Sequence, residues 1–143
     1  MSYDLMVFDP KISLYERDKF LTWYFDQTEW SEDHDYQNPD ATTPELHSWY
    51  LEMALEFPSI DDPNYADDVD NSKLTEYNFG SSIIYMAFAW SEMEDAREAV
   101  FRLAKKHKIG FFDVSAKNGQ VWFPDANGDY RCIHGDCSQE DAL

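Results

Sequence analysis

Apolar and aromatic residues follow one another without interruption from Ile83 to Trp90, and the turn residues Asn78 and Gly80 precede them. A short apolar run beside turn residues is typical of a strand that is buried on both faces. Its β-branched and aromatic content favours a strand over a buried helix. This run therefore predicts the strand around which the rest of the fold is arranged.

Before this strand, one strand and two helices are predicted. The segment from Tyr3 to Phe8 is rich in strand formers, and Asp9-Pro10 ends it. The first helix is expected to begin at Leu14, because Ser13 and Glu16 form a capping-box pattern. Its broad apolar face carries Phe20, Leu21, Tyr24 and Phe25.

The second helix has the most complete set of local signals. Thr43 is a good N-cap, Pro44 suits the first helical position, and Pro58 ends the segment. Apolar residues recur at helical spacing in between, at Leu46, Trp49, Tyr50, Met53 and Phe57. The following residues, 59–76, are rich in aspartate and are expected to form a long acidic loop.

After the central strand, Ser91 and Glu94 form another capping-box pattern, and a helix is predicted up to Lys108, with Gly110 behind it. A strand at 111–115 is expected next, parallel to the central strand because a helix connects the two. Asn118-Gly119 predicts a hairpin turn that leads to a strand at 121–123. Asn127-Gly128 predicts a further turn, which leads to a strand at 130–133.

These elements predict an α/β fold of the α+β type, with three helices and a mixed sheet of four or five strands. The order along the chain is β-α-α-β-α-β-β, with the strand at 130–133 as an optional last member. Residues 1–125 are expected to form a single domain and residues 126–143 a C-terminal hairpin and tail.

Composition narrows the class of protein. The chain has 143 residues, which suits one domain with its own hydrophobic core, and no apolar run approaches the roughly 20 residues of a membrane span. The N-terminus has no signal-peptide pattern. Two cysteines, Cys132 and Cys137, are too few for a disulfide framework. A cytoplasmic protein with free thiols is therefore expected.

The charge of the chain says more about its function than any motif does. The chain has 29 acidic and 11 basic residues, for a formal net charge of -18, and residues 20–71 contain no Lys or Arg. Such a balance disfavours nucleic acids and anionic membranes as partners and favours a basic protein. A solvated surface that only keeps the protein soluble would account for the charge equally well.

The acidic third also contains aromatic residues, which usually provide the anchors of a protein interface. Its candidate partner-binding residues are Trp23, Trp30, Glu32, Asp33, Asp35, Tyr36, Asp61, Asp62, Tyr65, Asp67, Asp68 and Asp70.

No metal or other cofactor is expected. The acidic residues at 32–35 and 61–70 are close in sequence, but neighbouring residues of an extended loop point apart and do not converge on one ion. Residues 125–136 have part of a calcium-loop spacing, but Tyr130 stands where the turn glycine belongs. Cys132, His134 and Cys137 supply only three of the four ligands of a zinc site.

Catalysis finds little support in the sequence. The chain has no glycine-rich phosphate loop, nucleophile elbow or HExxH motif. Candidates for a general base are Asp113 and the four histidines at positions 34, 47, 107 and 134, but nothing in the sequence pairs them. We therefore do not expect an enzyme.

Four stretches, Ser2–Phe8, Trp23–Trp30, Gly110–Ser115 and Val121–Pro124, resemble a set of small, uncharacterised bacterial proteins. No catalytic residues are known for those proteins, so none is carried over. In size, acidity and its single α/β domain, the chain is also similar to immunity proteins that neutralise bacterial toxins. That likeness implies a basic toxin, plausibly a nuclease, as the partner.

The leading hypothesis is therefore a bacterial immunity or inhibitor protein whose acidic, aromatic surface occludes a basic toxin. The first alternative is a small enzyme or ligand-binding protein with a pocket beside the acidic loops. The second is a homo-oligomer, because the central strand is apolar on both faces and each face must be covered.

Overall fold

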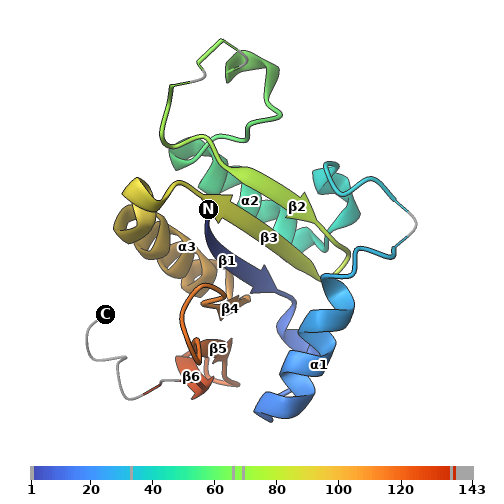
Figure 1. Ribbon diagram of the computed structural model, residues 1–143. Helices are drawn as coiled ribbons and strands as arrows, with labels where there is room; N and C mark the ends of the chain where they lie inside the picture. Colours follow the sequence, from blue (N-terminus) through green and yellow to red (C-terminus); the bar gives the residue numbers. More distant parts are fainter. Residues whose placement is uncertain (1, 33, 66, 69, 136, 138–143) are drawn as a thin grey trace.

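The computed structural model describes residues 2–32, 34–65, 67–68, 70–135 and 137, and it has the predicted α+β class (Figure 1). The strands are β1 (Tyr3–Phe8), β2 (Glu76–Phe79), β3 (Ile83–Phe88), β4 (Gly110–Phe112), β5 (Val121–Pro124) and β6 (Tyr130–His134). The helices are α1 (Arg17–Gln27), α2 (Pro44–Glu56) and α3 (Met93–His107). Short 3-10 helices lie at Pro10–Ile12, Pro39–Ala41, Pro63–Tyr65 and Trp90–Glu92.

The six strands form one open sheet in the order β2-β3-β1-β4-β5-β6, and all neighbouring strands are antiparallel. The sheet therefore has one strand more than expected and is not mixed. Strands β3 and β4 do point in the same direction, as the helical connection between them predicts. They are not neighbours, however, because β1 lies between them and is antiparallel to both.

The additional strand is β2, in a segment whose asparagine and glycine suggested only a turn. Tyr77 and Phe79 alternate with the polar residues Glu76 and Asn78, and only the two aromatic residues are buried. This alternation is typical of a strand that is buried on one face. Strand β6 also belongs to the sheet, paired with β5, so the sheet extends to His134.

Helices α2 and α3 cover one face of the sheet and enclose the larger core (Figure 1). Trp49 and Met53 of α2 and Val100 and Leu103 of α3 are buried there against the strands. Helix α1 covers only one end of the other face, where Phe20 packs with a smaller set of sheet residues, Met6, Phe8, Ile83, Phe112, Val121 and Phe123. Among the described residues, no helix covers the rest of that face.

Helix α2 begins and ends as its sequence predicts, and the Thr43 hydroxyl accepts a hydrogen bond from the Leu46 amide. In the other two helices the predicted capping boxes do not form. Ser13 ends the 3-10 helix at Pro10–Ile12 with a φ of 53°, and α1 starts at Arg17 without a side-chain cap. Helix α3 likewise follows a 3-10 turn and has no side-chain cap, but it ends at Lys108 as predicted.

Cys132 and Cys137 form a disulfide, so the prediction of two free thiols is wrong. The bond joins Cys132 in β6 to Cys137, three residues after the end of that strand. Two of the three candidate zinc ligands are therefore bonded to each other and cannot bind zinc as thiolates. In the described part of the chain no group of three metal-binding side chains comes together. No helix in the same residues is long and apolar enough to cross a membrane.

Gly110 lies in β4 directly against the ring of Phe8, and a methyl group at this position would lie 2.2 Å from the ring atoms. We expect Gly110→Ala to lower the free energy of unfolding by about 2 kcal/mol, because overpacking a filled core forces neighbours out of place. Urea denaturation measures the change.

Gly80→Ala is the matched control for this substitution. Its methyl group would come closest to the Ile83 side chain, at 3.1 Å, with Glu32 Oε2 at an ordinary 3.5 Å, and we expect a much smaller loss of stability. Equal stabilities of the two variants would show that the contact between Gly110 and Phe8 is not a close-packed one.

Candidate functional site

The predicted partner-binding residues gather at two places, at opposite ends of β2 (Figure 1). We call residues 30–42, which precede α2, the aromatic loop, and residues 59–75, between α2 and β2, the acidic loop. Trp23 belongs to neither, because its ring packs on Phe8 and Phe20 beneath α1. Asp33 lies outside the described residues.

The aromatic loop is fastened to the turn between β2 and β3. The carboxylate of Glu32 accepts hydrogen bonds from the backbone N–H of Ser81 at 3.0 Å and from its hydroxyl at 3.2 Å. The Phe79 amide donates to the Tyr36 carbonyl at 2.7 Å. The loop is therefore held both to the turn, through Glu32, and to the last residue of β2, through Tyr36.

Partial burial raises the pKa of Glu32, but the hydrogen bonds from His34 and Ser81 outweigh it, so the pKa lies below its ordinary value. A carboxylate with a lowered pKa stabilises the docked loop above its ordinary pKa, and this contribution is lost as the pH falls through the lowered pKa. The docking of the aromatic loop should therefore weaken in acid.

We expect Glu32→Ala to release the aromatic loop, because the two Ser81 donors lose their acceptor. Hydrogen exchange of the Phe79 amide should become about tenfold faster, the effect of losing a hydrogen bond to a charged group. The Gly80 amide, which donates to Ile83 within the turn, should not change. Glu29→Ala, which removes an exposed carboxylate just before the loop, is the control variant. Unchanged exchange at Phe79 in Glu32→Ala would show that Glu32 does not hold the loop.

Trp30 and Tyr36 of the aromatic loop line a hollow of about 460 Å³, which we call the aromatic hollow. Tyr24 and Thr28 at the end of α1, Glu76 and Asn78 of β2, and Tyr85 of β3 complete its lining. The Trp30 ring lies 4.9 Å from that of Tyr36 and 6.0 Å from that of Tyr85, at 72° and 88° between planes. The Trp30 ring is therefore nearly perpendicular to both tyrosine rings, so the three rings form different sides of the hollow.

The aromatic hollow exists because α1 leaves this part of the sheet uncovered. Glu76 of β2, Ala87 of β3 and Asp4 of β1 lie side by side in register, and all three are at least partly exposed. The Tyr85 hydroxyl donates to Asp4 at 2.6 Å, and burial together with this bond raises the pKa of Tyr85. The open face is therefore both aromatic and acidic.

The acidic loop is closed at its base by hydrogen bonds from the Ile60 amide to the Thr75 carbonyl at 3.0 Å and from the Thr75 amide to the Pro58 carbonyl at 2.9 Å. Beyond this base the loop projects from the body of the molecule (Figure 1). The carboxylates of Asp61, Asp67, Asp68 and Asp70 are exposed, whereas Asp62 and Tyr65 are partly buried. Within the described residues, none of its five aspartates forms an ion pair.

Four of the eleven basic side chains lie on α3, and three of these, Arg97, Arg102 and Lys106, pair with carboxylates. Arg102 pairs with Glu56 and Glu98, both at 2.8 Å. Lys106 pairs with Glu52 at 2.8 Å. Lys73, at the end of the acidic loop, contacts Glu92 at 2.9 Å instead of the loop's aspartates. The positive charges thus leave the acidic surface beside β2 without neutralisation.

The four histidines lie far apart in the fold, each with partners of its own. His34 pairs with Glu32, His47 contacts the Pro39 carbonyl at 3.1 Å, and His107 pairs with Glu52 at 2.9 Å. His134 meets Arg17 at 3.1 Å, and burial together with this cation lowers the pKa of His134. The calcium-like segment is a hairpin turn, in which Asp125 accepts from the Asn127 and Asp129 amides and pairs with Arg131.

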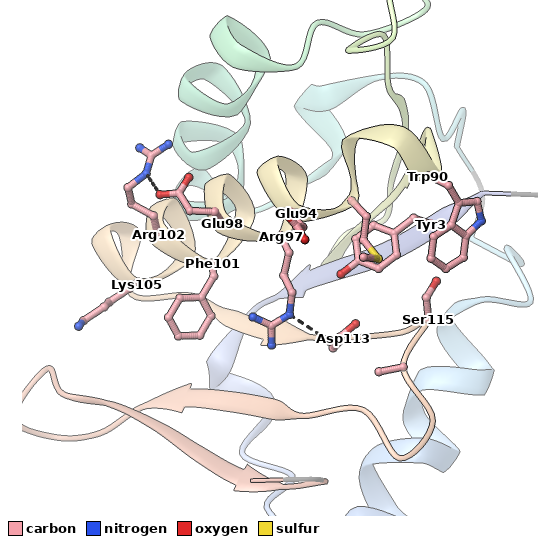
Figure 2. Close-up of a pocket in the computed structure, with 12 residues that line it drawn as sticks. Tyr3, Trp90, Glu94, Arg97, Glu98, Phe101, Arg102, Lys105, Asp113 and Ser115 are labelled. Carbon is pink, nitrogen blue, oxygen red and sulfur yellow. Dashed lines mark hydrogen bonds and ion pairs between the residues drawn. The ribbon is translucent and has the colours of Figure 1, made fainter. Parts of the chain in front are cut away.

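A second hollow, which sequence reasoning did not anticipate, runs along α3 beside the connection between β4 and β5 (Figure 2). We call it the α3 groove; its volume is about 800 Å³. Arg97 of α3 and Asp113 meet at its floor with an Nε–Oδ2 distance of 3.1 Å. Arg97 also donates to Gln120 at 3.0 Å, and its guanidinium lies over the Phe111 ring.

The fold and its surfaces define a small α+β protein with an open acidic and aromatic face at one edge of its sheet. No family model, curated protein or solved structure matches this chain. The interpretation of its function therefore depends on the surfaces themselves.

Proposed function

We propose that this protein is an inhibitor that binds a basic protein through the surface on both sides of β2. As in bacterial immunity proteins, the proposed partner is a basic toxin, and a nuclease is the kind of toxin we propose. The inhibitor occludes the toxin's cationic active site and needs no cofactor to do so.

The observation that carries this proposal is the segregation of charge. Four of the five aspartates of the acidic loop and Glu76 of β2 are exposed and form no ion pair among the described residues, while Arg102 and Lys106 are paired along α3. Unneutralised charge of one sign on one surface speeds the approach of an oppositely charged protein and orients it. A surface that served solubility alone would not need this separation.

The aromatic hollow supplies an anchor for the same partner. A Lys or Arg side chain is attracted to the faces of Trp and Tyr rings, and Glu76 at the rim adds a carboxylate. Exposed apolar side chains, Leu51 and Leu55 of α2 and Ile60 of the acidic loop, add contact area. A polar surface with a few aromatic and apolar anchors is the composition that protein interfaces commonly have.

The proposal is tested by affinity capture from a lysate of the native host, followed by purification and titration of any basic protein retained. We expect a complex of one inhibitor with one basic protein, a dissociation constant that rises with salt, and loss of the partner's activity in the complex. Binding that is insensitive to salt, or a captured protein whose activity persists in the complex, would contradict the proposal.

A further inference from the structure

The α3 groove contains a carboxylate oxygen without a hydrogen-bond donor. Asp113 is only 7% exposed, and among the residues that the structure describes its Oδ1 has no partner. The other oxygen, Oδ2, accepts from Arg97 Nε. Figure 2 shows the carboxylate at the floor of the groove, between Arg97 and Ser115. A buried acceptor without a donor is costly, and a ligand that brings a donor removes this cost.

The charge of Asp113 is already balanced by Arg97, which is itself held by Gln120. A second cation at this position would be repelled by the guanidinium. A neutral O–H or N–H group suits the free oxygen better, because it supplies a hydrogen bond without adding charge.

Most of the surface that lines the groove is apolar, and the charged residues Glu94, Glu98, Arg102 and Lys105 also border it. Tyr3 and Trp90 stand at one end with ring centroids 5.3 Å apart, and Phe101 lies toward the other end (Figure 2). Trp90 and Met93 are 44% and 36% exposed at the rim. A concave, largely apolar site with a few polar groups at its floor is the usual form of a small-molecule site, and the volume lies in the usual range.

We propose that the α3 groove binds a small, flat, largely apolar molecule that carries a neutral hydroxyl or N–H donor, with a phenol as the simplest example. The ring lies against Trp90 and Met93 at one end of the groove, and the donor bonds to Asp113 Oδ1. The site is independent of the acidic surface beside β2, so it stands or falls separately from the proposed inhibition.

The test compares 4-propylphenol with 4-propylanisole, which has the same ring and chain but no donor. Binding is followed in the whole protein by NMR, through the shifts of the Trp90 indole N–H and the Arg97 side chain. We expect the phenol to bind in the groove about tenfold more tightly than the ether, the effect of one hydrogen bond to a charged acceptor. Equal affinities, binding elsewhere or no binding would overturn the proposal.

Asp113→Asn distinguishes a ligand-binding role from a structural one. Arg97 Nε keeps the amide oxygen as its acceptor, so the amide N–H₂ takes the place of Oδ1 and presents a donor to the groove. The preference for the phenol should then disappear or reverse. Persistence of the preference in this variant would also overturn the proposal.

Trp90→Ala serves as a second variant in case Asp113→Asn is too unstable for titration, because Trp90 is exposed at the rim. Both probes should bind this variant more weakly, while the tenfold ratio between them should remain. Affinities unchanged from the wild type would place the probes outside the groove. If a basic partner protein displaces the phenol, the groove is part of the protein interface and the proposal of a small-molecule site is wrong.

Discussion

Replacing Asp61, Asp67, Asp68 and Asp70 together by Asn is expected to slow association with a basic partner about 100-fold at low salt. All four side chains are exposed on the acidic loop, and no cation neutralises them in the described part of the chain. Long-range attraction between the partners should therefore fall while the fold persists. Stopped-flow mixing measures the association rate, and in about 0.5 M salt the two proteins should differ much less.

A matched control removes the same number of charges from other surfaces. Asp18 and Asp26 of α1, Asp95 of α3 and Asp129 before β6 are all exposed. The variant with these four changed to Asn has the same net charge as the acidic-loop variant. We expect its association rate to fall only slightly. Equal slowing of both variants would mean that net charge alone matters, and the acidic loop would lose its assigned role.

Replacing Asp113 by Ala is expected to lower the free energy of unfolding by about 3 kcal/mol, because it leaves Arg97 partly buried without its counter-charge. The Arg97 side chain is 20% exposed and the Asp113 side chain 10%, so this value lies at the low end for buried pairs. The loss should appear in urea denaturation as a lower midpoint with an unchanged slope.

The double variant Arg97→Met, Asp113→Leu is the corresponding control. It replaces both charges by apolar side chains, which often restores the stability that a single replacement loses. We expect it to be more stable than Asp113→Ala alone. A loss below about 1 kcal/mol in Asp113→Ala would show that the pair contributes little, as exposed ion pairs do.

Helix α2 could be predicted closely, because its start and its end both depend on residues next to it, Thr43, Pro44 and Pro58. The capping-box pattern at Ser13 failed because Ser13 ends a 3-10 helix with a φ of 53°, and the pattern at Ser91 failed because Ser91 lies inside a 3-10 helix. Local pattern cannot show that β1 lies between β3 and β4, since the pairing joins residues far apart in sequence.

For the candidate surfaces too, some residues could be predicted from the sequence and others could not. Trp30 and Tyr36 could be predicted as binding residues because they are aromatic residues in an acidic segment, and both line the aromatic hollow. Tyr24 and Tyr85 join that hollow only through the packing of α1 beside the sheet. Trp23 looks equivalent to Trp30 in the sequence, yet helical geometry directs it toward Phe8. The pairing of Arg97 with Asp113 has no local signal, because it depends on how α3 packs beside β4.

The most direct test of the proposed inhibition is protection of cells from the captured basic partner. Host cells that lack this protein would be made to produce the partner, and their growth would be measured with three forms of the inhibitor: the wild type, the acidic-loop variant and the matched control. We predict that the wild type and the control restore growth and that the acidic-loop variant protects poorly. Growth that is unaffected by the partner, or full protection by the acidic-loop variant, would contradict the account.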